Sequence, residues 1–77
     1  MSAFVTLKVT TARDALSLEM PGMTTALYAA KRFADALGLD SDMHWILIRG
    51  LAPVPDDELA SELVGERLGL AIEVDGP

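Results

Sequence analysis

The stretch FVTLKVTTARDALSLEM, residues 4–20, decides the fold of this chain. Apolar residues alternate with threonine and lysine from Val5 to Val9, and a similar alternation returns from Leu16 to Met20. A period of two with β-branched residues is typical of a strand that has one buried face. The four residues between the two runs suit a turn. We therefore predict an N-terminal β-hairpin.

A helix is predicted to follow the hairpin. Pro21-Gly22 ends the second strand. Residues 26–37 are rich in Ala, Leu, Lys and Arg, which favour helix. Thr24 or Thr25 is a suitable N-cap, and Gly38 is placed to cap the C-terminus. At helical spacing, the side chains expected to face the core are those of Ala26, Ala30, Phe33 and Leu37.

The second half of the chain contains two further strand patterns. Trp45-Ile46-Leu47-Ile48 is a short apolar run, which we predict to be a strand at the sheet centre. The prolines that follow keep the next stretch from joining the sheet as an interior strand. Asp56-Asp57-Glu58 is expected to start a short helical turn, with Leu59 and Leu63 packing inward. The alternation from residue 68 to 74 predicts the last strand.

Composition limits the kinds of partner that the chain can bind. The net charge is −6, and all of this excess lies in residues 51–77. Such a chain repels phosphate backbones, so we expect no nucleic acid partner. A basic protein surface is the natural complement. We also expect no membrane insertion, because no apolar run approaches 18 residues. Without cysteine or a targeting signal, we expect a cytoplasmic location.

The order hairpin, helix, strand, short helical turn and strand resembles the ubiquitin-like β-grasp fold. The glycine turn at the end of Trp45–Gly50 and the turn within Leu63–Leu68 look like those of this family. The resemblance implies an α+β fold, in which a mixed sheet of four to five strands packs on one α-helix. It implies a single ubiquitin-like domain over residues 1–77 with a short C-terminal tail, 75–77. The chain resembles ubiquitin-like proteins of bacteria in particular.

The end of the chain bears on what the resemblance implies about function. Ubiquitin-like modifiers expose a Gly-Gly end, whereas this sequence ends in Gly76-Pro77 and carries Glu73 and Asp75 where ubiquitin has arginines. Proline is a poor acyl donor there, because its ring is bulky and its φ is fixed. A protein modifier conjugated through Gly76, after Pro77 is removed, is one hypothesis. Its partners would be activating, conjugating and deconjugating enzymes.

The alternative hypothesis is a ubiquitin-like adaptor that is never conjugated. The small accessory proteins of type VII secretion have this size and fold, lack a Gly-Gly tail and often carry a tryptophan near the central strand, as Trp45 does here. The partner would then be a component of the secretion machinery. A sulfur carrier is disfavoured, because the terminal glycine pair is missing.

Two opposite registers are open for residues 45–48. If Ile46 and Ile48 face the helix, then Trp45 and Leu47 face outward and form an exposed apolar patch with Ala71. We predict this patch to be a protein-binding site, since Trp is enriched at the energetic centres of interfaces. His44, the only histidine, would join it. In the other register Trp45 is ordinary core.

We expect no catalytic site, cofactor or metal centre in this chain. A lone histidine without cysteine lacks the partners of a metal site. No nucleophile–base constellation and no glycine-rich phosphate loop is evident. The acidic run at residues 56–58 is better explained as a solvated helix start than as an acid–base pair. The sequence therefore favours a protein that acts by being bound, not an enzyme.

Overall fold

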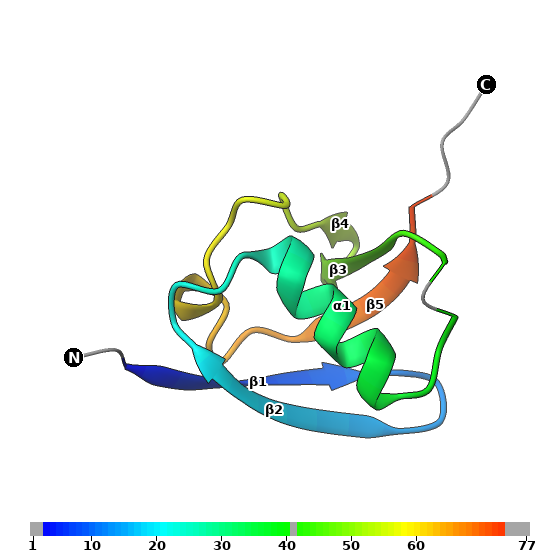
Figure 1. The fold of residues 1–77 in the computed structure, drawn as a ribbon, viewed down its shortest axis with the longest axis horizontal. Helices are drawn as coiled ribbons and strands as arrows, with labels where there is room; N and C mark the ends of the chain where they lie inside the picture. The colour runs from blue at the N-terminus through cyan, green and yellow to red at the C-terminus, as the bar shows by residue number, and fades with distance from the viewer. Residues whose placement is uncertain (1–2, 41, 74–77) are drawn as a thin grey trace.

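The computed structural model describes residues 3–40 and 42–73, and within them both strands of the predicted hairpin are present. Each element is labelled in chain order, and Figure 1 shows their arrangement. The elements are β1 (Phe4–Thr10), β2 (Ala15–Pro21), α1 (Ala26–Ala36), β3 (Trp45–Arg49), β4 (Ala52–Pro53), the 3-10 helix η1 (Ala60–Glu62) and β5 (Leu68–Ile72).

The strands form one mixed five-stranded sheet in the order β2-β1-β5-β3-β4. β5 runs parallel to β1 and antiparallel to β3, while β1–β2 and β3–β4 are antiparallel. α1 lies across one face of this sheet (Figure 1). The predicted β-grasp fold is confirmed. The prediction that β3 is the central strand is wrong, because β5 inserts between the hairpin and β3.

The ends of α1 explain why this segment is helical. The Thr25 hydroxyl accepts a hydrogen bond from the Tyr28 N–H at 3.4 Å. At the other end Gly38 adopts φ 72°, and the Leu39 N–H donates to the Ala34 carbonyl at 2.9 Å. This is the Schellman pattern, which satisfies carbonyl groups of the last turn. The predicted caps are thus both confirmed.

The core lies between α1 and the face of the sheet that α1 covers. Phe33 is the largest fully buried side chain, and alanines surround it on the helix, so the helix backbone approaches the sheet closely. Leu37, predicted to be core, is the C-cap and is only partly buried. The fully buried residues that the strands and η1 region contribute include Leu7, Val9, Met20, Leu47, Leu63 and Leu68.

The short helix begins later than the sequence predicts, at Ala60 instead of the acidic run. The reason is that the backbone before it caps α1. The Ala26 N–H donates to the Glu58 carbonyl at 2.8 Å, and the Leu27 N–H donates to the Asp56 carbonyl at 3.2 Å. Carbonyl groups directed toward α1 cannot start a second helix. Leu63 and Ala60 are buried, whereas Leu59, which was predicted to pack inward, is 37% exposed.

No helix among the described residues is long and apolar enough to cross a membrane. The predicted tail, 75–77, lies outside the described residues, as do residues 1, 2, 41 and 74.

Two glycines provide a matched test of the helix end. We predict that Gly38→Ala lowers the free energy of unfolding by about 1 kcal/mol, because a Cβ is strained at φ 72° although nothing lies within 4 Å of it. Gly69→Ala, in β5, should leave stability unchanged or raise it by about 0.5–1 kcal/mol, since its φ is not positive and its Cβ would have room. Urea denaturation measures both. A larger loss for Gly69→Ala than for Gly38→Ala would contradict this account of the helix end.

Candidate functional site

The register of β3 decides which side chains the sheet exposes. Leu47 is 1% exposed and lies in the core, and Trp45 packs against the same core. Both therefore face α1, and the alternation of the strand places Ile46 and Ile48 on the opposite face. The prediction that Trp45 and Leu47 face outward is wrong. The alternative register, with Trp45 on the core side, is the one observed.

Physical chemistry accounts for this register. A tryptophan and a leucine offer more apolar area for burial than two isoleucines do. The indole N–H of Trp45 also gains a partner, because its Nε1 donates to the carbonyl of Asp40 at 2.7 Å. Asp40 lies in the link between α1 and β3, so this hydrogen bond joins the link to the strand. Trp45 has a structural role here.

The face of the sheet opposite α1 carries an apolar strip. On β3 and β5, Ile46 is paired with Ala71 and Ile48 with Gly69. Residues directly opposite on neighbouring strands project to the same side. Ile46, Ile48 and Ala71 therefore form what we call the open-face strip. The outward direction predicted for Ala71 is confirmed, and its neighbours are the isoleucines. Leu51, at the turn between β3 and β4, is fully exposed.

His44 lies at one end of the open-face strip. Its Nδ1 is 3.5 Å from a carboxylate oxygen of Glu73, and both side chains are about half exposed. The Glu73 N–H also donates to the His44 carbonyl at 2.8 Å, which extends the β3–β5 pairing by one step. Within residues 3–40 and 42–73, no three His, Cys, Asp or Glu side chains are grouped to hold a metal ion.

An ion pair fixes the loop after β4. One Arg49 nitrogen is 2.7 Å from Glu58 Oε2, and the other is 3.4 Å from Oε1. Arg49 projects toward the core side, as Trp45 and Leu47 do, and its side chain is 39% exposed whereas the Glu58 side chain is 16% exposed. Two parallel hydrogen bonds add geometric specificity to such a pair. Arg49 therefore serves the fold.

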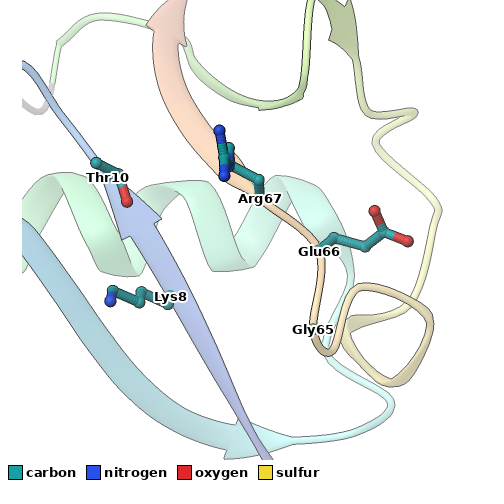
Figure 2. Close-up of a pocket in the computed structure, with 5 residues that line it drawn as sticks. All are labelled: Lys8, Thr10, Gly65, Glu66 and Arg67. Carbon is teal, nitrogen blue, oxygen red and sulfur yellow. The ribbon is translucent and has the colours of Figure 1, made fainter.

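A hollow of about 440 Å³ adjoins the sheet beside β1 and the start of β5, and Figure 2 shows its lining. Lys8 and Arg67 are its cations. They lie far apart in the sequence but line the same hollow, because Val9 of β1 is paired with Leu68 of β5. We name this hollow the basic notch; its lining residues are Lys8, Thr10, Gly65, Glu66 and Arg67. The sequence does not indicate the notch, because it depends on this parallel pairing.

Comparison with known proteins identifies the fold. No protein-family model matches the sequence, and no curated protein matches it significantly. The structure is similar to the solution structure of the N-terminal ubiquitin-like domain in the 4931431F19Rik protein, with a TM-score of 0.74 and 18% sequence identity. The match covers 100% of this chain and 83% of that chain. The fold is therefore that of a ubiquitin-like domain.

Gly76 and Pro77, the residues predicted to form a conjugation tail, lie outside the described residues. The role predicted for His44 in protein binding stays a prediction, as does that of Ala71.

Proposed function

We propose that this chain is a non-catalytic module that binds partner proteins through the open-face strip. The observation that carries the proposal is the register of β3, which turns Ile46 and Ile48 away from the core. α1 covers the other face of the sheet, so no helix of residues 3–40 and 42–73 lies over these isoleucines, and both are partly exposed (Figure 1). Apolar side chains gathered on a surface commonly mark protein interfaces.

The surroundings of the strip suit a protein partner. Gly69 and Thr10 lie beside it and carry small side chains or none, so a partner can approach the sheet closely. Leu51 is fully exposed at the turn that connects β3 to β4. The chain has no cysteine, and its one histidine is paired with Glu73. These features support binding without chemistry.

The double variant Ile46→Thr/Ile48→Thr tests the strip. Threonine keeps the β-branched shape that the strand favours but removes apolar contact area. Proteins captured from a lysate of the native host would be identified by mass spectrometry, and one would then be purified. We expect its affinity, measured by calorimetry, to fall by about tenfold or more, because central apolar contacts dominate binding energy.

Tyr28→Ala is the matched control. Tyr28 is 57% exposed on α1, on the other side of the molecule, and alanine favours helix. The control should bind like the original chain, and circular dichroism should show that both variants are folded. Equal affinity of the double variant and the original chain would refute the proposal, and so would a larger loss with the control.

A second candidate is covalent attachment to target proteins through the Gly76 carboxylate after Pro77 is removed. The last described strand ends at Ile72, so the stretch to be conjugated would follow the sheet. The position of Gly76 after this strand is equally compatible with an adaptor that is never conjugated. Activating, conjugating and deconjugating enzymes, or a component of the secretion machinery, are the respective partners. A bacterial source and a cytoplasmic location stay predictions.

Mass spectrometry of a tagged copy from the native host separates the two. If the chain is a modifier, we expect heavier species in which Gly76 is joined to a lysine side chain of another protein. Gly76→Ala should reduce these species, while Gly38→Ala, at the end of α1 and away from the open face, should not. Recovery of the tagged chain with Pro77 intact, and without such adducts, would contradict the modifier hypothesis and leave the non-covalent proposal standing.

A further inference from the structure

We propose that the basic notch binds a carboxylate-bearing, acidic segment of a partner protein, next to the apolar contacts that the open-face strip makes. This inference rests on the proposed function, and it specifies the chemistry of the partner. The sequence alone favours a basic partner, since the net charge is −6. The structure shows that the notch beside the strip is lined by two cations, Lys8 and Arg67, and one acid, Glu66.

The pairing of β1 with β5 builds the notch. Val9 and Leu68 are partners in register, and both are buried. The residues that precede them, Lys8 and Arg67, are exposed and project to the other side. Two cations from distant parts of the sequence thus border the same hollow. In Figure 2, which looks on the sheet with α1 behind it, Lys8 and Arg67 extend from adjacent segments.

Neither Lys8 nor Arg67 forms a salt bridge with another described residue, so both are available to a ligand. The salt bridges found among these residues join His44 to Glu73 and Arg49 to Glu58. Glu66 lines the hollow, but its carboxylate points away from Lys8 in Figure 2. Exposed charges more than about 8–10 Å away are largely screened at physiological salt. Two cations, Lys8 and Arg67, outnumber the one acid, Glu66, in the lining of the notch, and Glu19 of β2 lies on the same face of the sheet.

The notch and the open-face strip are continuous. Gly69 lies between them, since it is paired with Ile48 and follows Leu68. A Cβ built on Gly69 would meet only the Thr10 carbonyl oxygen, at 3.9 Å. No side chain therefore projects from the sheet at Gly69. An extended segment can place a carboxylate at the notch and an apolar side chain over Ile48.

Carboxylate chemistry fits the two cations. The guanidinium of Arg67 presents paired N–H donors that match a carboxylate, and the ammonium of Lys8 adds a second charge. A nucleic acid would also present anions, but its continuous charge would extend past the notch to the acids of this chain, which outnumber the cations by six. A short acidic segment places its few charges at the notch alone.

Two synthetic peptides test the inference by NMR titration of the ¹⁵N-labelled chain. The probe is acetyl-Leu-Asp-Asp-Leu-Asp-amide, and the control has asparagine at each aspartate. We expect the acidic peptide to bind about fivefold more tightly, as two exposed charge pairs would provide. The backbone amides of Lys8, Arg67 and Gly69 should shift, and the preference should shrink as sodium chloride is raised.

Matched charge variants locate the site. Lys8→Gln/Arg67→Gln should abolish the preference for the acidic peptide. Arg13→Gln/Arg32→Gln removes the same amount of charge from the hairpin turn and α1, where both arginines are exposed. This variant should keep the preference for the acidic peptide. Equal affinity of the two peptides for the open face would overturn the inference but leave the proposed function intact. Loss of the preference in both double variants, or shifts confined to α1, would also overturn it.

Two further outcomes count against the inference. Inorganic phosphate is titrated as a competitor, and displacement of the acidic peptide at equal concentration would identify a free-anion site instead. Absence of any shift on the open face with either peptide would likewise overturn it. The proposed function would then be judged separately, by the affinity of the purified partner for Ile46→Thr/Ile48→Thr.

Discussion

The burial of Leu47 beneath α1 is the constraint on which the rest of the structure depends. Among the described residues one α-helix, α1, covers one face of the sheet, so each strand buries mainly the side chains that face this helix. In β3 the buried side chain is that of Leu47, and Trp45 packs against the same core. Because successive side chains alternate, Ile46 and Ile48 must face the other way. The same packing that stabilises the core thus creates the apolar surface that we propose as a binding site.

Much of this fold is predictable from local sequence. The hairpin has clear two-residue alternation, and α1 has both a threonine cap and a glycine at its end. Which side chains of β3 face the core is not predictable in this way, because four consecutive apolar residues show no alternation. The sequence places the start of the short helix too early, because the carbonyl groups of Asp56 and Glu58 cap α1 and this tertiary contact is not visible in local sequence. The basic notch depends on the parallel pairing of β1 with β5, which joins opposite ends of the chain.

The distribution of charge links the two proposals. All of the acidic excess follows Gly50, and the first acids of this part lie in the loop between β4 and η1, beside the start of α1. Lys8 and Arg67 border the hollow beside the opposite face of the sheet. A net charge describes solubility and long-range steering, whereas a binding surface is governed by the charges within a few ångströms of it. A chain that is acidic as a whole can therefore favour an acidic segment at one place.

The most direct test of the central claim is a measurement of which β3 side chains meet the solvent. Methyl groups of isoleucine and leucine would be ¹³C-labelled, and a soluble nitroxide would be added to broaden the NMR signals of accessible methyls. The account predicts strong broadening at Ile46 and Ile48 and little at Leu47, with Leu7 as a buried reference. Broadening of Leu47 with protection of both isoleucines would contradict it, because β3 would then have the opposite register.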